Sequence, residues 1–384
     1  MHMEELKVTF QIITPMFLSG ADQEKAEFRL ASLKGALRYW YRSIDPSYNH
    51  PVSSSSSISK ESWIFGGAKQ GEGQSRFLMR MESHHQMNVV SNKQDNSKYH
   101  KPTYFAFFLK TKVETAPMKK DYVPRLCLVP NRTVTVYFFR RTSNKVCDPI
   151  EEWKALLSSI WLLGHLGGLG SRSRRGFGTL ALKSWGFTND SSANQLLKQL
   201  PIANNESSIK AWKNHFLASL NSIKSWFGEW QDICEHSIIN HKTSFYCREQ
   251  KYNSWNEALD DVAKVIQDFR KKNKDHRFAL GMPLKIKEKM KKSKSSKPKE
   301  IVYTPFDGER YASPVWIRII EIKGKYYPFI AVLTPPKKIA IAEQEEGKKE
   351  TKTMFKHDFS MHDALNKFCI YLNDYGDKGW KRCE

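Results

Sequence analysis

A segment rich in glycine and arginine, residues 164–178, holds the residues of this sequence best suited to bind phosphate. Glycine leaves backbone amides free to form a concave anion site, and arginine adds planar donors that match phosphate oxygens. The ring of Phe177 is a candidate for stacking on a base. The other residues that we expect to bind RNA here are Gly168, Gly170, Arg172, Arg174, Arg175 and Gly176.

This segment matches neither of two well-known phosphate loops. A Walker A loop needs the pattern GxxxxGK[ST], and a dinucleotide-binding loop needs GxGxxG directly after a strand. A flexible turn without a ligand is the alternative interpretation. The density of arginine beside glycine favours a binding loop over that alternative.

A second group of cations lies on a predicted helix with Ser32 as a candidate N-cap. Lys34, Arg38 and Arg42 are spaced four residues apart and therefore form one row beside the apolar stripe of the helix. The helix dipole disfavours Lys34 in the first turn, and a bound phosphate would reverse that penalty. We expect the row to extend an RNA-binding groove, although an ordinary solvent-exposed basic face would show the same spacing.

The overall charge also indicates a polyanionic partner. The chain of 384 residues has 62 Lys and Arg against 40 Asp and Glu, a formal net charge of +22. This excess favours nucleic acid first and an acidic membrane surface second. The Lys-rich run 285–299 is predicted to be an exposed arm, which either binds RNA or simply faces solvent. No stretch has the apolar length of a membrane span and the N-terminus lacks a signal core, so we expect a cytoplasmic protein.

A search for catalytic or metal-binding patterns gives little. The six cysteines are scattered without a CxxC pair, which argues against a disulfide framework and a zinc ribbon, and no cofactor is predicted. Cys234, His236, His241 and Cys247 match no common metal-ligand spacing. His165 could act as a general base in metal-independent RNA cleavage, but a packing histidine at a helix end is the favoured interpretation. The sequence therefore predicts a binding protein rather than an enzyme.

The first half of the chain alternates strands and helices in the order strand, helix, strands, helix, strand. Asp148 followed by Pro149 is a helix start signal, and Trp40 lies on the apolar stripe of the first helix, which favours a core position over stacking on a base. The predicted strands are residues 6–13, 77–81, 104–109, 133–139 and 179–185, and the predicted helices cover residues 32–44 and 148–163. This β-α-β-β-α-β order predicts an α+β, ferredoxin-like domain over residues 1–186.

The second half is less regular. Lys323, Gly324 and Lys325 separate two apolar runs and predict a hairpin. The predicted helices are residues 209–230, 255–270 and 362–372, and the predicted strands are residues 278–286, 315–322 and 326–333. Residues 53–59 and 87–100 are predicted loops. These patterns favour a second α+β domain over residues 187–384, ferredoxin-like with a helical insertion.

Three segments together resemble a known family. They are the SLKGALRYWYR helix (residues 32–42), the WIFG segment (residues 63–66) and the glycine/arginine loop (residues 168–178). The first 186 residues resemble the RAMP superfamily of CRISPR proteins, and more narrowly the first subunits of type III-B Cmr effector complexes.

The resemblance implies a function. Such a chain would be a non-catalytic, RNA-binding subunit of a type III-B CRISPR Cmr complex that targets RNA in antiviral defence. It would contact guide RNA or single-stranded target RNA in a basic cleft between two domains, beside other subunits of the complex. A metal-independent endoribonuclease that processes CRISPR precursor RNA is the alternative, and a scaffold whose basic surface meets other proteins is a third possibility.

Overall fold

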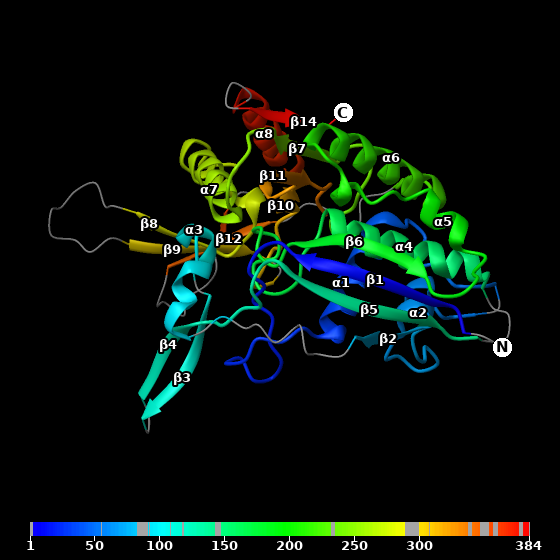
Figure 1. The fold of residues 1–384 in the computed structure, drawn as a ribbon. Coiled ribbons are helices and arrows are strands. Elements are labelled where there is room, and N and C mark those ends of the chain that lie inside the picture. Colours follow the sequence, from blue (N-terminus) through cyan, green and yellow to red (C-terminus); the bar gives the residue numbers. More distant parts are fainter. Residues whose placement is uncertain are drawn as a thin grey trace, which may run out of the picture.

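The structure is a computed structural model with two antiparallel four-stranded sheets at its centre (Figure 1). It describes residues 3–383, with these positions excepted: 55, 83–90, 92, 108, 117–118, 143–146, 232–234, 289–298, 307, 337–339, 346–352, 356–359 and 376–378.

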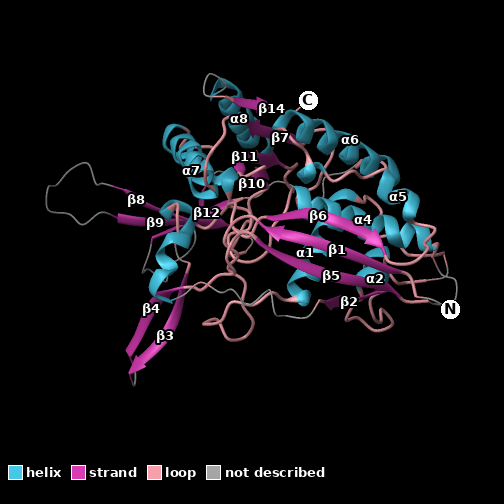
Figure 2. Cartoon of the chain, viewed as in Figure 1, coloured by secondary structure: helices cyan, strands magenta, loops and turns pink. Residues whose placement is uncertain are grey.

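The first sheet holds β1 (Glu5–Ile12), β2 (Phe77–Met81), β5 (Arg132–Arg140) and β6 (Leu180–Phe187) in the order β2-β5-β1-β6. All three pairings in this sheet are antiparallel. Two helices, α1 (Leu30–Ile44) and α4 (Pro149–His165), cover one face, behind the strands in the view of Figure 2. The alternating apolar residues of β1 supply the core on that face, because Leu6, Val8 and Phe10 are all fully buried.

Helix α4 begins where the sequence predicts. The side chain of Asp148 accepts a hydrogen bond from the backbone amide of Ile150 at 2.9 Å, and Pro149 opens the first turn. The helix is buried along most of its length because α1 lies on one side of it and β6 on another. Its last residue, His165, leads directly into the glycine/arginine loop.

The second sheet repeats the strand order of the first. It holds β7 (Ser244–Arg248), β10 (Val315–Ile322), β11 (Lys325–Val332) and β14 (Trp380–Arg382) in the order β10-β11-β7-β14, again with antiparallel pairing throughout. Helices α7 (Trp255–Lys272) and α8 (Met361–Asp374) cover one face, where Phe269 lies 4.9 Å from Phe368 between ring centroids. Helix α6 (Ile209–Phe227) covers the other face through Phe216, which contacts Phe245 and Phe329.

Smaller elements connect these two layers or extend from them. Strands β3 (Lys110–Ala116) and β4 (Lys119–Pro124) form a two-stranded hairpin that projects from the body in Figure 1. Strands β8 (Leu284–Glu288), β9 (Lys299–Pro305), β12 (Ile341–Glu345) and β13 (Thr353–Phe355) form a sheet of their own in the order β13-β12-β9-β8. Short helices are α2 (Lys60–Phe65), α3 (Thr103–Ala106) and α5 (Asn194–Lys198), with 3-10 turns at Lys93–Tyr99, Ala203–Asn205 and Arg277–Leu280.

Several predictions about local structure were wrong. Helix α1 begins at Leu30 with Arg29 as N-cap, so Ser32 lies inside the helix and does not cap it. The predicted strand at residues 104–109 is largely the short helix α3, because Phe105 and Ala106 are buried on one side of a helical turn. The predicted strand at residues 278–286 begins as a 3-10 turn and becomes a strand at Leu284. The run 285–299, predicted as an exposed arm, begins in β8 and ends in β9, and its central residues lie outside the described part of the chain. Residues 87–90 of the predicted loop 87–100 also lie outside it.

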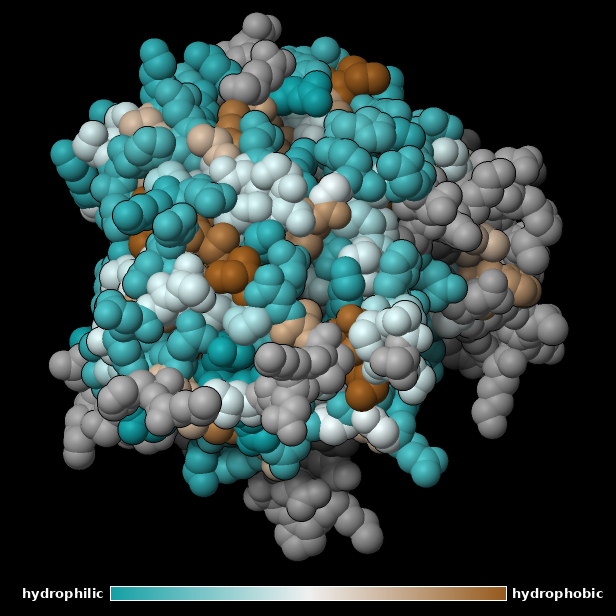
Figure 3. All heavy atoms as spheres, turned by 90° about the vertical axis from the view of Figure 1, so that its right-hand side faces the viewer, coloured by the Kyte–Doolittle hydropathy of each residue, from teal (hydrophilic) through white to brown (hydrophobic). Residues whose placement is uncertain are grey.

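The face of the molecule shown in Figure 3 is mainly hydrophilic where it is coloured. On the face shown in Figure 3, hydrophobic side chains gather in small patches separated by hydrophilic ones. Among the described residues, no helix is both long and apolar enough to cross a bilayer.

Candidate RNA-binding site

The glycine/arginine loop runs between α4 and β6 and lies against the second sheet (Figure 1). The backbone amide of Ile317 in β10 donates to the carbonyl of Arg174 at 3.2 Å. The loop also joins the end of β1, because the amide of Gly178 donates to Pro15 and the amide of Ser171 donates to Phe17, both at 2.8 Å. The loop is therefore held from both halves of the chain.

The glycines of the loop bring backbone close to other parts of the same chain. A Cβ atom at Gly168 would lie 2.7 Å from the carbonyl oxygen of Gly178, and one at Gly170 would lie 2.6 Å from that of Phe17. Gly170 and Gly176 have φ angles of 86° and 83°, which side chains disfavour. Contacts within the chain therefore require glycine at these positions, and the binding of phosphate by backbone amides near Gly168, Gly170 and Gly176 stays a prediction.

The three arginines of the loop differ in their surroundings. Arg172 is exposed and donates to the carbonyl of Phe107 at 2.8 Å. Arg174 donates to the carbonyl of Ser313 and lies over two aromatic rings, those of Tyr39 at 5.0 Å and Trp316 at 4.9 Å. Their bonding partners are thus uncharged, and the positive charge of both side chains stays unneutralised.

Arg175 is the most constrained of the three. Its guanidinium donates to the carbonyl of Leu280, and Arg270 from α7 donates to the same oxygen at 3.2 Å. The Nη1 atom of Arg175 is buried and has no hydrogen-bond partner among the described residues. Burial, with Arg270 as the next cause, lowers the pKa of Arg175 to about 9. Two guanidinium groups therefore share one neutral acceptor.

Three further arginines join this group, and sequence reasoning missed them. Arg125 donates to the side chain of Ser171 at 2.8 Å, and Arg270 donates to the hydroxyl of Tyr104 at 2.9 Å. Partial burial, followed by the charges of Arg270 and Arg310, lowers the pKa of Arg172. We call the arginine cluster the set Arg125, Arg172, Arg174, Arg175, Arg270 and Arg310. Arg125 and Arg310 stand alone in sequence and Arg270 stands with lysines at the end of α7, so no glycine-rich pattern marks any of them.

The arginine cluster carries surplus charge. None of the ion pairs between residues that the structure describes includes a member of this cluster. Guanidinium groups that lack carboxylate partners favour a bound polyanion, because phosphate oxygens accept their hydrogen bonds and neutralise their charge. Such a cluster can hold a phosphodiester backbone.

The cationic row on α1 has a different environment. Arg38 donates to the carboxylate of Glu61 at 2.7 Å, and Arg42 lies 3.1 Å from the same oxygen. Glu61 is buried in α2, so this pairing neutralises part of the row. Lys34 lies one turn further toward the helix N-terminus and has no such partner among the ion pairs of the described residues. Arg38 and Arg42 thus share a carboxylate that Lys34 does not contact, so the three cations of the row do not form a uniform extension of the arginine cluster.

Two aromatic candidates for stacking on a base are buried. Phe177 is fully buried and meets Phe17 edge to face at 5.4 Å between centroids. Trp40 is also fully buried and lies 4.9 Å from Trp316, as its place on the apolar stripe predicts. The expectation that Phe177 stacks on a base is therefore wrong for this conformation, because its ring faces protein on all sides.

His165 cannot serve as the base of a ribonuclease in this conformation. It is fully buried, stacks on Trp161 at 4.0 Å, and shares a 2.8 Å hydrogen bond through Nδ1 with the carbonyl of Trp161. Burial, and after it the charge of Arg318, lowers the pKa of His165 to about 3, so the ring is neutral at pH 7. The packing interpretation of His165 is confirmed.

The cysteines and histidines considered as metal ligands do not come together in the described part of the chain. His236 shares a hydrogen bond with the carbonyl of Arg42, and Cys247 is buried in β7, while Cys234 lies outside the described residues. Among the residues that the structure describes, no three His, Cys, Asp or Glu side chains are grouped to hold a metal ion.

Comparisons with known proteins agree with this architecture. The family model for the RAMP superfamily matches residues 9–181. The chain is 23% identical over 339 residues to the CRISPR system Cmr subunit Cmr1-1 of Pyrococcus furiosus, covering 85% of this chain and 86% of that protein. It is 28% identical over 193 residues to Cmr1-2 of the same organism, covering 47% of this chain and 96% of that protein.

Solved structures show a shared fold. The crystal structure of Cmr1 from Pyrococcus furiosus in its apo form aligns with a TM-score of 0.55 and 17% identity, over 99% of this chain and 98% of that one. A chain in the cryo-EM structure of the type III-B Cmr-beta complex bound to cognate target RNA aligns with a TM-score of 0.55 and 12% identity, over 96% of this chain and 100% of that one. Residues 9–181 are therefore similar to the RAMP superfamily, and most of the chain is similar to the Cmr subunit Cmr1-1.

Proposed function

We propose that this chain is a non-catalytic, RNA-binding subunit of a type III-B CRISPR Cmr complex that targets RNA in antiviral defence. In this proposal the arginine cluster holds the phosphate backbone of guide RNA, of target RNA or of both. The other partners are the remaining subunits of the complex, and the compartment is the cytoplasm.

The observation that carries the proposal is the pairing of Arg175 with Arg270 on one carbonyl oxygen, that of Leu280. A structural arginine this constrained normally meets a carboxylate, because an unpaired buried charge is costly. Here the Nη1 atom of Arg175 has no partner within the described residues. A phosphate bound by the exposed Arg172 would supply the negative charge that this buried group lacks.

The relatives support the choice of RNA as the polyanion. One similar chain is part of a Cmr-beta complex bound to cognate target RNA, and two relatives are named as Cmr subunits. The net charge of +22 agrees with a nucleic-acid partner.

We also propose that the chain consists of two ferredoxin-like domains, residues 1–186 and 187–384. Each central sheet has the strand order of that fold, with its first strand between its third and fourth. The helix pairs α1 with α4, and α7 with α8, stand at the two helix positions of the β-α-β-β-α-β order. The arginine cluster draws residues from both domains and would lie in the cleft between them.

Within this site the exposed Arg172 would contact phosphate directly, whereas Arg174 and Arg175 would supply charge from fixed positions. Lys34, with Arg38 and Arg42 beside it, would contact RNA at a separate place on α1. The backbone amides near Gly168, Gly170 and Gly176 keep a secondary role in the proposal, since the glycines themselves are explained by contacts within the chain.

Protection of arginine side chains by RNA tests the proposed site. The protein is treated with phenylglyoxal, which modifies accessible guanidinium groups, with and without single-stranded RNA at moderate salt. We expect RNA to protect Arg172 and Arg310, which are exposed in the free protein. Absence of RNA binding, or equal modification of both residues with and without RNA, would overturn the proposal.

The non-catalytic part of the proposal has its own test. The protein is incubated with CRISPR precursor RNA in the presence of a chelator, and the RNA is analysed for cleavage. We expect the RNA to stay intact because His165 is fully buried and cannot reach a ribose 2′-hydroxyl. Cleavage of the RNA at a defined position, by an activity that co-purifies with the protein, would contradict this expectation.

A further inference from the structure

Arg318 in β10 is a buried arginine that no carboxylate neutralises in the described part of the chain. Its side chain is 1% exposed, and its Nη2 atom donates to the carbonyl of Leu180 in β6 at 3.1 Å. Its Nε and Nη1 atoms are buried and have no hydrogen-bond partner among the described residues. Glu321, three positions along the strand, pairs with Lys183 instead, at 3.3 Å. A buried charge and two unmet donors are each costly, so this place favours an acceptor that is itself negatively charged.

The charge of Arg318 persists at neutral pH. Burial lowers the pKa of this guanidinium to about 9, and burial is the one cause that acts on it. With that pKa the group is protonated at pH 7 in about 99% of molecules. A nearby carboxylate would have raised the pKa, so this shift agrees with the missing ion pair. Loss of the proton therefore does not relieve the cost of burial at neutral pH, whereas a bound anion does.

The indole of Trp40 supplies another donor on the same side of β10. Trp40 is fully buried, and its Nε1 atom has no hydrogen-bond partner among the residues that the structure describes. Its ring lies 4.9 Å from that of Trp316, which stands two positions before Arg318. Side chains two positions apart in a strand point to the same face and are separated by roughly 7 Å. The N–H of Trp40 and the guanidinium of Arg318 are therefore carried by adjoining side chains.

His165 marks the limit of this donor group. After burial, the charge of Arg318 is the next cause that lowers the pKa of His165, so the two side chains are neighbours. The Nδ1 atom of His165 donates to the carbonyl of Trp161, which makes Nε2 of the neutral ring an acceptor. An acceptor does not hold an anion, so the anion belongs with Arg318 and Trp40.

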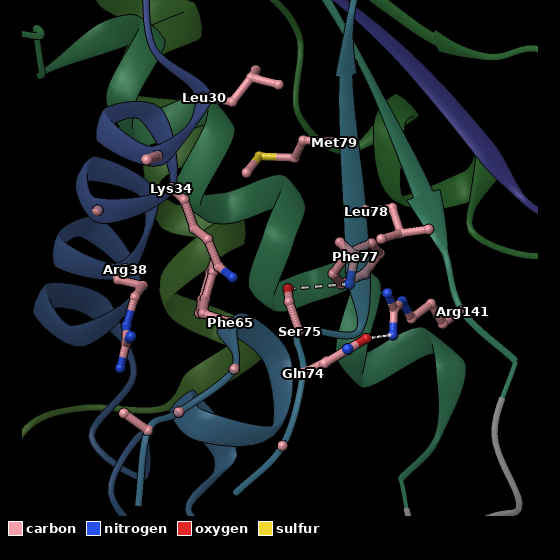
Figure 4. A pocket seen from close by; sticks show the side chains of 16 residues that line it. Leu30, Lys34, Arg38, Phe65, Gln74, Ser75, Phe77, Leu78, Met79 and Arg141 are labelled. Carbon is pink, nitrogen blue, oxygen red and sulfur yellow. Dashed lines mark hydrogen bonds between the residues drawn. The ribbon is translucent and has the colours of Figure 1, made fainter. Parts of the chain in front are cut away.

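The enclosure of these residues limits the size of the ligand. Arg318, His165 and Trp40 are each at most 1% exposed. The cations on the other side of α1 differ, because Lys34 and Arg38 line a pocket at the surface (Figure 4). A phosphodiester backbone continues on both sides of every phosphate, so it does not fit an enclosed site. The ligand is therefore a small free anion.

We propose that Arg318, with the indole N–H of Trp40, binds one inorganic anion of about the size of chloride between the two halves of the chain. Arg318 stands in the second sheet and donates to β6 of the first sheet, so the anion would neutralise the charge where the two sheets meet. Binding to the folded chain alone would stabilise it. This inference does not rest on the function proposed above.

The dependence of stability on chloride tests the site. Urea denaturation of the full chain is measured at constant ionic strength, with sodium gluconate replacing sodium chloride, because gluconate is too large for an enclosed site. If unfolding releases one anion, the unfolding constant should fall about tenfold for each tenfold rise in chloride once the site is occupied. A water molecule in place of the anion would give no dependence on chloride, and that result would overturn the proposal.

Two variants assign the chloride effect to a residue. Arg318→Met removes the charge and keeps a long side chain, so the unfolding constant should become independent of chloride. Replacement of a buried charge by an apolar side chain is often tolerated, which makes the variant suitable for this measurement. Lys210→Ala, which removes an exposed cation on α6, should keep the full dependence of the wild type. Equal dependence of Arg318→Met and wild type would assign the effect to surface cations and overturn the proposal.

A direct measurement on the wild type decides the question if Arg318→Met does not fold. Crystals of the full chain are soaked in sodium bromide, and the anomalous scattering of bromide locates the bound ions. We expect a peak within hydrogen-bond distance of the Nε or Nη1 atom of Arg318. Peaks at surface cations alone would show binding at crystal concentration only, and they would overturn the proposal.

Discussion

The guanidinium carbon of Arg174 lies 4.9 Å from the ring centroid of Trp316, so a loop of the first half of the chain is fixed on a strand of the second half. The same guanidinium lies 5.0 Å from the ring of Tyr39 in α1, and Tyr39 accepts a hydrogen bond from the indole of Trp316 at 3.2 Å. This contact connects three elements that are far apart in sequence. It also fixes the backbone on either side of Arg174, which carries Arg172 and Arg175.

Removal of the Arg174 side chain should therefore destabilise the whole chain. We expect Arg174→Ala to lower the free energy of unfolding by about 2 kcal/mol, because two partly desolvated cation–π contacts and one hydrogen bond are lost. Urea denaturation followed by tryptophan fluorescence measures the change. Arg172→Ala is the matched control, since its exposed side chain makes one hydrogen bond to a carbonyl, and it should cost less than about 0.5 kcal/mol. Equal stability of Arg174→Ala and wild type would show that the contact does not hold the halves together.

The exposed members of the arginine cluster should determine the salt dependence of RNA binding. Each phosphate neutralised on a single strand contributes about 0.7 to the slope of log affinity against log salt. The double change Arg172→Ala with Arg310→Ala should therefore flatten that slope by about 1.4. Titrations of labelled RNA at several salt concentrations give the slope.

The control for this measurement removes two cations elsewhere. Lys198 and Lys210 are exposed and lie outside the arginine cluster, so their double change to alanine should leave the slope unaltered. Equal flattening by both double variants would mean that net charge, and not the cluster, governs binding.

A buried carboxylate on α4 should matter more to stability than its exposed neighbour. Glu152 is 1% exposed and accepts hydrogen bonds from Arg76 at 2.9 Å, Arg140 at 3.3 Å and Trp63 at 2.8 Å. Glu152→Gln leaves Arg76 without its charge partner and removes one of the two carboxylates that Arg140 contacts, so it should cost about 3 kcal/mol in urea denaturation. Glu151→Gln, one residue away on the exposed side, should cost less than about 0.5 kcal/mol. Similar losses for the two variants would refute a structural role for this network.

The buried histidine should make stability depend on pH. The pKa of His165 is about 3 in the folded chain, below its ordinary value of 6.5, so the unfolded chain binds the proton between these values. Stability from this residue is complete above about pH 6.5 and is lost as pH falls toward 3. Between pH 7 and pH 5 the wild type should lose about 2 kcal/mol more than His165→Asn, which keeps a donor for Trp161 and does not titrate. Parallel stability curves for the two proteins would show that His165 is accessible to protons.

The sequence predicted the elements whose signals are local. The alternation in β1, the cap at Asp148 and the turn at Gly324 each determine one element through contacts within a few residues, and all three are present. The strand β14 and the short β7 were missed, because β14 has three residues and depends on pairing with β7 more than 120 positions away. Their stability comes from a register that no local pattern shows.

The residues of the candidate site were likewise predicted only in part. The arginines of the loop were found because they stand beside glycines, whereas Arg270 and Arg310 join them through folding of the second half. The pairing of Arg38 and Arg42 with Glu61 was not predictable, because α2 carries that carboxylate onto α1 from about 20 positions further along the chain. Phe177 was predicted to stack on a base because its ring stands beside arginines. An aromatic ring in such a loop can instead pack inside the protein, and Phe177 packs against Phe17.

The sheet of β13, β12, β9 and β8 joins two hairpins that lie at separate places in the second half of the chain. Strands β8 and β9 lie between α7 and β10, strands β12 and β13 lie between β11 and α8, and the two hairpins meet where β9 pairs with β12. A shortened β9 would leave β12 with an unpaired edge, and a shortened β12 would leave β9 with one. Across relatives, gains and losses of length in these two segments should therefore occur together, while the central sheet keeps its size.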